Sequence, residues 1–114
     1  MLRLPNFENA YIDLVKLTEY CLNELHPIGK QKALVFKSAL GINSSDATLL
    51  NQEILKELIN CECQEREEDA FGRRFSVTMN IRIFTKTAKV ITSWIIKTGE
   101  DFPRLTTCYI KRKR

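Results

Sequence analysis

One run of alternating residues limits what this chain can fold into. Between residues 75 and 83 every second side chain is apolar, and polar side chains stand between them: Phe75, Val77, Met79, Ile81 and Ile83 alternate with Ser76, Thr78, Asn80 and Arg82. Successive side chains of a strand point to opposite faces of its sheet, so the alternation predicts a strand that is buried on one face only. A sheet covered on one side is therefore expected.

The first sixty residues show helical spacing instead. Three helices are expected, over 14–25, 27–41 and 47–60. Asp13 is a plausible N-cap for the first, and Pro27 suits the first turn of the second, which Gly41 ends. The turn from Asn43 to Asp46 supplies a capping residue for the third. Helical and extended segments are thus expected to be segregated along the chain.

The later connections complete the expected architecture. The acidic run 65–69 with Phe71 and Gly72 predicts a loop or a frayed edge strand, and residues 85–88 a hairpin connection. Two further strands are expected over 89–97 and 104–111. Helices followed by an antiparallel meander favour an α+β fold with the helices on one face of the sheet. The predicted single domain consists of a helical half (1–62), an acidic connection (63–72), a sheet (73–111) and a basic tail (111–114).

Length and composition restrict the class of protein. A chain of 114 residues, 44% hydrophobic, can bury one core, and no apolar run approaches the roughly 20 residues that span a bilayer. The start lacks the apolar stretch of a secretory signal, so a cytoplasmic protein is expected. Four cysteines without a C-x-x-C pair are expected to be reduced thiols. No glycine-rich phosphate loop or metal-binding motif occurs, and we expect no cofactor and no metal.

The charge is distributed unevenly. Residues 1–70 carry 7 Lys/Arg and 12 Asp/Glu, whereas residues 71–114 carry 11 and 2, so the two parts have net charges of −5 and +9. A positive surface attracts phosphates over a Debye length of roughly 8 Å at physiological salt. RNA or DNA is the obvious partner. A solvated sheet face followed by a basic tail explains the same charges without a partner.

A candidate catalytic set can be drawn from both halves. The only histidine, His26, precedes Lys30 and Lys32 at the expected start of a helix. RNA cleavage without metal needs a base for the 2′-hydroxyl proton, a cation for the pentacoordinate phosphate and donors that orient it. His26 is the candidate base, Lys32 or Arg104 is the candidate cation, and Thr107 and Tyr109 are the candidate donors. Lys30, Trp94 and Lys97 are further candidates for contacting the substrate.

Each of these residues also has an ordinary structural explanation. A histidine before a proline at a helix start often caps the helix, and lysines such as Lys30 and Lys32 are commonly solvated. Trp94 is a natural core residue. Arg104 is spaced to pair with Glu100 or Asp101. The spacing alone leaves both explanations open.

Motifs spread over nearly the whole chain resemble a small bacterial family of unknown function. They are Leu4-Pro5-Asn6-x-Glu8-Asn9-Ala10, Lys16-Leu17-x-x-Tyr20, His26-Pro27-x-Gly29-x-x-Lys32-Ala33-x-x-Phe36, Leu40-Gly41, Thr92-x-Trp94-Ile95, Thr98-Gly99 and Pro103-Arg104-Leu105-x-Thr107-x-Tyr109. Members of that family occur beside a putative antitoxin or as C-terminal modules of larger toxins. The layout is also similar to the barnase, EndoU, colicin and RelE-like ribonuclease toxins. This resemblance implies an active-site set of His26, Lys32, Thr92, Arg104, Thr107 and Tyr109.

These observations lead to two hypotheses. The first is a cytoplasmic, metal-independent ribonuclease toxin with a cognate antitoxin, in which His26 is the general base and Lys32 and Arg104 hold the scissile phosphate. Its product is expected to be a 2′,3′-cyclic phosphate, and DNA to be resistant. The second is a non-catalytic interaction module, such as an immunity protein or adaptor, that binds a partner or nucleic acid through charge. Both depend on whether His26 meets the last strand in space.

Overall fold

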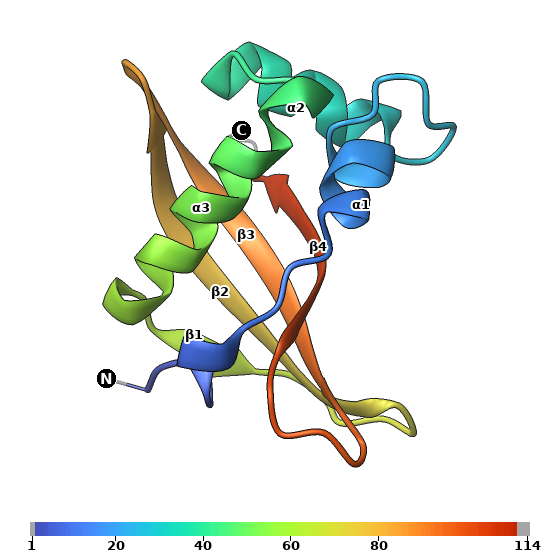
Figure 1. The fold of residues 1–114 in the computed structure, drawn as a ribbon, viewed down its shortest axis with the longest axis vertical. Coiled ribbons are helices and arrows are strands. Elements are labelled where there is room, and N and C mark those ends of the chain that lie inside the picture. Colours follow the sequence, from blue (N-terminus) through green and yellow to red (C-terminus); the bar gives the residue numbers. More distant parts are fainter. Residues whose placement is uncertain (1, 112–114) are drawn as a thin grey trace.

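The computed structural model describes residues 2–111, in which helices cover one face of a four-stranded antiparallel sheet (Figure 1). The strands, which neighbour one another in chain order, are β1 (Cys63–Glu65), β2 (Gly72–Ile83), β3 (Lys86–Lys97) and β4 (Arg104–Ile110). The helical elements are η1 (Phe7–Asn9), α1 (Leu14–Lys16), η2 (Leu17–Cys21), α2 (Lys30–Leu40), η3 (Ser44–Asp46), α3 (Ala47–Glu57) and η4 (Leu58–Asn60). The predicted α+β fold, with helices first and an antiparallel meander second, is confirmed.

The core lies between the helices and the covered face of the sheet. The five alternating apolar residues of β2 are all buried, as their spacing predicts. The alternation of residues along β3 does not show which of its two faces is buried. The pairing of β3 with β2 does. Phe75 pairs with Trp94 and Val77 with Thr92, so Thr92 and Trp94 face the core. Ile91 and Ser93, which pair with Thr78 and Ser76, belong to the open face.

The first helix is shorter than its apolar spacing predicts. Asp13 caps it as expected, because its Oδ1 accepts from the Val15 N–H at 3.0 Å. Regular α-helix ends at Lys16, and η2 continues as a wider π-helical turn that ends at Cys21 rather than near residue 25. The side chain of Asn23 donates to the Glu19 carbonyl at 3.2 Å and accepts from the Leu25 N–H at 2.9 Å. These local bonds compete with further helical ones.

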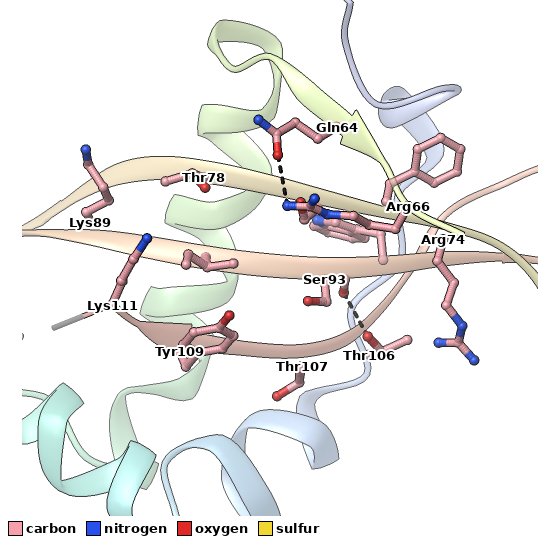
Figure 2. Close-up of a pocket in the computed structure, with 14 residues that line it drawn as sticks. Gln64, Arg66, Arg74, Thr78, Lys89, Ser93, Thr106, Thr107, Tyr109 and Lys111 are labelled. Atoms are coloured by element: carbon pink, nitrogen blue, oxygen red, sulfur yellow. Dashed lines mark hydrogen bonds between the residues drawn. The ribbon is translucent and has the colours of Figure 1, made fainter. Parts of the chain in front are cut away.

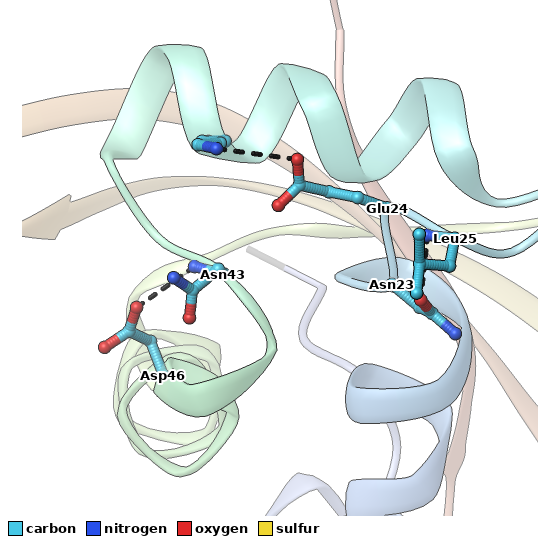
Figure 3. A network of polar contacts seen from close by, with 6 residues as sticks. Asn23, Glu24, Leu25, Asn43 and Asp46 are labelled. Carbon is cyan, nitrogen blue, oxygen red and sulfur yellow. Dashed lines mark hydrogen bonds and ion pairs between the residues drawn. The ribbon is translucent and has the colours of Figure 1, made fainter.

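The next two helices begin and end with identifiable caps. Gly41 ends α2 in the left-handed region, with φ of 70°. Asn43 and Asp46 form a reciprocal capping box that leads into α3 (Figure 3). The same view shows Glu24 paired with Lys37 of α2, at 3.6 Å, which ties the preceding loop to that helix. The predicted end of the third helix near residue 60 agrees with η4.

Two connections differ from the sequence-based expectation. The predicted hairpin between β2 and β3 is present, but the bounds 85–88 of its connection are wrong, because Ile83 already pairs with Lys86 and only Phe84 and Thr85 form the turn. Phe84 has a φ of 55°. Glycine or asparagine is the usual residue in such a turn, and either one would have indicated the turn from the sequence. In the acidic connection, only Glu65 of the run 65–69 lies in the edge strand β1, which pairs with β2, whereas residues 66–68 form a loop.

Other expectations concern the ends of the chain and the membrane. Residues 112–114 of the predicted basic tail lie outside the described residues. Among residues 2–111, no helix combines the length and the apolar character needed to cross a bilayer.

Candidate functional site

A cavity lies beside β4, where η2 and the loop before α2 reach the edge of the sheet. Its volume is about 510 Å³, and we call it the edge cavity. It is lined by Asp13, Val15, Lys16, Glu19, Tyr20, His26, Lys32, Thr106 and Thr107. Three of the predicted catalytic residues, His26, Lys32 and Thr107, therefore line one cavity although they are up to 81 positions apart in the chain.

His26 is held by the backbone that follows it. Its Nδ1 accepts hydrogen bonds from the N–H groups of Ile28 at 3.0 Å and Gly29 at 2.9 Å. A neutral imidazole has one N–H and one acceptor nitrogen, so the proton of His26 lies on Nε2. The turn from Pro27 to Gly29 thus occupies the positions expected for the first helical turn, and α2 begins at Lys30 instead of Pro27.

This geometry explains the spacing of the His26-Pro27-x-Gly29-x-x-Lys32 motif. A Cβ on Gly29 would lie 2.5 Å from the carbonyl oxygen of Tyr20, so only glycine allows the loop to approach η2 this closely. The approach brings the Tyr20 ring edge-on to His26, with ring centroids 4.9 Å apart. One turn after Gly29, Lys32 faces the same ring.

Two lysines, Lys16 and Lys32, line the edge cavity, and aromatic rings hold Lys32 in place. Its Nζ lies 5.3 Å from the ring centroid of Tyr20 and 5.2 Å from that of Tyr109, so two aromatic faces hold it between η2 and β4. Among the described residues no carboxylate forms an ion pair with it. Its charge is therefore available to an anion that enters the cavity.

A pair of buried thiols lies behind the cavity wall. Cys21 of η2 and Cys108 of β4 are both fully buried and unbonded, and the Sγ of Cys21 lies 3.7 Å from the Oγ1 of Thr107. A hydrogen bond from Cys108 lowers the pKa of Cys21 to about 6, with further help from Thr107 and Lys32 against the cost of burial. The pKa of Cys108 is raised well above its ordinary value by the same pairing and by burial. The pairing thus favours the thiolate on Cys21 rather than on Cys108.

Arg104, the other predicted phosphate ligand, does not line the edge cavity. It lines a neighbouring depression of about 180 Å³, and its guanidinium binds Glu100 through two hydrogen bonds of 2.9 Å each. This pair lowers the pKa of Glu100 and raises that of Arg104. The guanidinium also lies against the rings of Tyr11 and Phe102, at 5.3 and 4.7 Å. Arg104 is therefore paired with Glu100, as its spacing allowed, and does not stand ready to bind a phosphate.

The remaining predicted site residues are dispersed. Thr92 is 0% exposed and Trp94 1%, so neither lies where a substrate could touch its side chain. Instead the Trp94 Nε1–H donates to the Thr92 hydroxyl, which donates to the Val77 carbonyl, each at 2.8 Å. Lys30 is exposed and does not line the edge cavity. Lys97 lies at the far end of β3, beside the Arg104 depression.

A larger depression covers the open face of the sheet (Figure 2). We call it the sheet groove, and its volume is about 830 Å³. Thr106 and Thr107 line it as well as the edge cavity, so the two depressions meet at these residues. At this point the pairing of β3 with β4 shifts register at Ser93 and Trp94, which gives β4 an extra residue in Thr106. The bulge turns neighbouring side chains of β4 toward both depressions.

Sequence reasoning assigned no functional role to six residues that line the edge cavity: Asp13, Val15, Lys16, Glu19, Tyr20 and Thr106. Lys16 and Tyr20 belong to one motif of the family resemblance, which was the available signal. Glu19 and Thr106 carry no comparable signal, because a helical glutamate and a strand threonine are common. No group of three or more His, Cys, Asp or Glu side chains able to hold a metal occurs in the part of the chain that the structure describes.

The fold and the cavity define a small α+β protein with a polar site at the edge of its sheet. The model of one family, Domain of unknown function (DUF6883), matches residues 3–112. The chain therefore belongs to this family, whose description assigns no activity. No curated protein and no solved structure matches the chain.

Proposed function

We propose that the protein is a metal-independent ribonuclease toxin of a toxin–antitoxin pair, which cleaves RNA in the edge cavity by attack of the 2′-hydroxyl. The observation that carries the proposal is the meeting of His26 and Lys32 from the helical half with Thr107 from the last strand around one cavity. An imidazole, an unpaired ammonium group and a hydroxyl are the groups that phosphodiester transfer requires.

Lys32 supplies the positive charge in this mechanism. The transition state carries extra negative charge on the phosphoryl oxygens, and a fixed cation in a partly enclosed site stabilises it more than it stabilises the ground state. Because two aromatic rings hold Lys32, little reorganisation is needed when the phosphate arrives. Arg104 is bound to Glu100 and lies outside the edge cavity, so Lys32 rather than Arg104 takes this role.

The proton transfers assign different roles to His26 and Glu19. The Nδ1 of His26 accepts two backbone hydrogen bonds, and therefore its Nε2–H acts as a donor to the phosphoryl oxygens rather than as the general base. Glu19 lines the edge cavity and takes the proton of the 2′-hydroxyl. The bond from the 2′-oxygen to phosphorus forms as the bond to the 5′-oxygen breaks, and the leaving oxygen takes a proton from solvent. The products are a 2′,3′-cyclic phosphate and a 5′-hydroxyl.

The hydroxyls of β4 orient the substrate. When Cys21 is ionised, its sulfur can only accept, so the Thr107 hydroxyl donates to it and keeps its oxygen as an acceptor for a substrate donor other than the attacking 2′-hydroxyl. Tyr109 holds Lys32 from the opposite side. As the toxin of such a pair it would act in the cytoplasm, and a cognate antitoxin with an acidic surface would inhibit it by covering the edge cavity and the sheet groove beside it.

The test is cleavage of a labelled RNA by the purified protein in the presence of a chelator. The expected result is a fragment that ends in a 2′,3′-cyclic phosphate, with no cleavage when the sugar at the cut position is 2′-deoxy. Induced expression in bacteria should arrest growth. Cleavage of the deoxy substrate, or no cleavage of any RNA by a folded protein, would contradict the proposal.

Variants of His26 separate chemistry from folding. His26→Asn keeps a side-chain oxygen that can accept from the backbone N–H groups of residues 28 and 29, and asparagine is among the best capping residues. It removes Nε2. We expect this variant to fold and bind RNA but to lose cleavage and growth arrest. Lys30→Ala, two residues before Lys32 and outside the edge cavity, is the matched control and should remain active.

One alternative has support from the same structure. The unpaired lysine and the neighbouring basic groove could bind nucleic acid without cutting it, as a non-catalytic interaction module or adaptor does. In that case wild type and His26→Asn would behave identically in growth and cleavage while both bind RNA. The cleavage experiment therefore distinguishes the two functions directly.

A further inference from the structure

The sheet groove has a basic rim. Arg66, Lys89 and Lys111 line it, together with Arg74, and none of its lining residues is Asp or Glu. In Figure 2 Arg66 extends over the open face from the edge of β1, while Lys89 and Lys111 lie at the other end of the groove. The face that the helices leave open is thus surrounded by positive charge.

Most of this charge is not neutralised within the protein. Arg66 is held by neutral groups, since its Nε donates to the Ser76 hydroxyl at 3.0 Å and its Nη2 to the Gln64 side-chain oxygen at 2.8 Å. Among residues 2–111, no ion pair includes Arg66, Lys89 or Lys111. Arg74 differs, because its Nε lies 2.6 Å from a carboxylate oxygen of Asp69. Three cations, of which Arg66 is held by hydrogen bonds, therefore have no ion-pair partner among the described residues.

The floor of the groove is partly apolar and aromatic. Ile91 and Tyr109 are direct partners across β3 and β4, and both are half-buried on the open face. A flat aromatic and aliphatic floor inside a cationic rim suits a nucleic-acid single strand, whose bases stack on the floor while its phosphates meet the rim. A duplex hides the faces of its bases and can use only the rim.

The groove leads into the edge cavity. Thr106 and Thr107 line both, so a strand that lies across the open face reaches Lys32 without leaving the protein surface. From β1 to β4 the sheet spans three strand spacings of about 4.8 Å, or about 14 Å. This span accommodates a few nucleotides, and Tyr109 stands at the junction with its ring facing Lys32.

We propose that the sheet groove binds single-stranded RNA, with Arg66 and Lys89 on its phosphates and Ile91 and Tyr109 against its bases, and delivers it to the edge cavity. The delivery rests on the ribonuclease function proposed above, whereas the binding does not. Arg66, which directly follows β1, and Lys89, in the first half of β3, lie outside the predicted catalytic set, so binding and cleavage can be altered separately.

The test measures binding of a fluorescent single-stranded RNA whose sugars are 2′-O-methylated, which cannot be cut by its own hydroxyl. The double variant Arg66→Ala/Lys89→Ala is compared with Lys37→Ala/Lys56→Ala, which removes the same charge from α2 and α3. We expect the groove variant to bind about tenfold more weakly, with a salt dependence less steep by about 1.4, since each phosphate contact on a single strand contributes about 0.7. The helix variant should bind as wild type does.

A second variant protects the test against loss of fold. Lys89→Glu changes one exposed residue and should weaken binding without changing the unfolding transition. Equal binding by the groove and helix variants, or duplex RNA bound as tightly as the single strand, would overturn the inference. So would an acidic protein that binds the groove when RNA does not. Retained RNA binding without any cleavage would instead overturn the ribonuclease proposal and leave this inference standing.

Discussion

Lys32 and Arg104 are two cations at the same edge of the sheet, and their surroundings give them different capacities. Lys32 lies between two aromatic rings with no carboxylate partner among the described residues, whereas Arg104 is bound twice by Glu100 and packed against Tyr11 and Phe102. A ring holds a cation in place without cancelling its charge, and a carboxylate cancels it. Only the first arrangement leaves charge for a substrate.

The largest expected effect is on the chemistry at Lys32. Lys32→Ala should lower kcat for RNA cleavage about 10²–10³-fold, the usual cost of removing one group that stabilises the transition-state charge. Lys32→Arg should recover part of this loss, because the charge returns with different geometry. Single-turnover cleavage measures both, with Lys30→Ala as the control. If the Lys32→Ala enzyme were as fast as wild type, the charge of Lys32 would not be used in catalysis.

The next effect concerns Thr92, which the family resemblance placed in the active site and the structure places in the core. Thr92→Val keeps the shape but leaves the Trp94 N–H and the Val77 carbonyl without their partner. We expect a loss of about 1–3 kcal/mol in the free energy of unfolding. Thr87→Val on the same strand is exposed and should change it by less than about 0.5 kcal/mol. Denaturant unfolding measures both.

If Thr92 also touched substrate, Thr92→Val would raise KM in conditions where the variant is fully folded. We expect KM to stay unchanged there. The pair of measurements therefore separates a residue that shapes the sheet from one that binds RNA.

Much of this fold could be predicted from local patterns. The alternation in β2 set the covered face, and the caps at Asp13 and Gly41 fixed helix ends, because each depends on residues close together in sequence. The turn at Phe84 could not be predicted, since it uses a residue that rarely adopts positive φ. Whether Lys32 or Arg104 keeps its charge free depends on rings and carboxylates brought together by folding. His26 illustrates both, because its hydrogen bonds to the backbone of Ile28 and Gly29 are local and its neighbours in the edge cavity are not.

A third prediction follows from the thiol pair behind Lys32. The pKa of Cys21 is lowered to about 6 in the folded protein, chiefly by the hydrogen bond from Cys108. The unfolded chain holds the Cys21 proton to higher pH, so the contribution of Cys21 to stability grows as pH rises from about 6 to 9.0 and is lost as pH falls. Cys21→Ala should lack this rise in denaturant unfolding. The ultraviolet absorbance of the thiolate, titrated in wild type and variant, provides an independent measurement.

The smallest expected effect is that of Arg104. Arg104→Ala removes an ion pair whose side chains are 32% and 28% exposed, and pairs of this exposure contribute little to stability. We expect a slight fall in Tm and almost no change in kcat, because the guanidinium lies outside the edge cavity. The pKa of Glu100 is lowered by Arg104, so the pair stabilises the fold at neutral pH and is lost as the carboxyl protonates. At acid pH the difference in Tm between wild type and Arg104→Ala should therefore become smaller still. A fall in kcat as large as that of Lys32→Ala would mean that Arg104 leaves Glu100 to bind the scissile phosphate, and the contrast between the two cations would then fail.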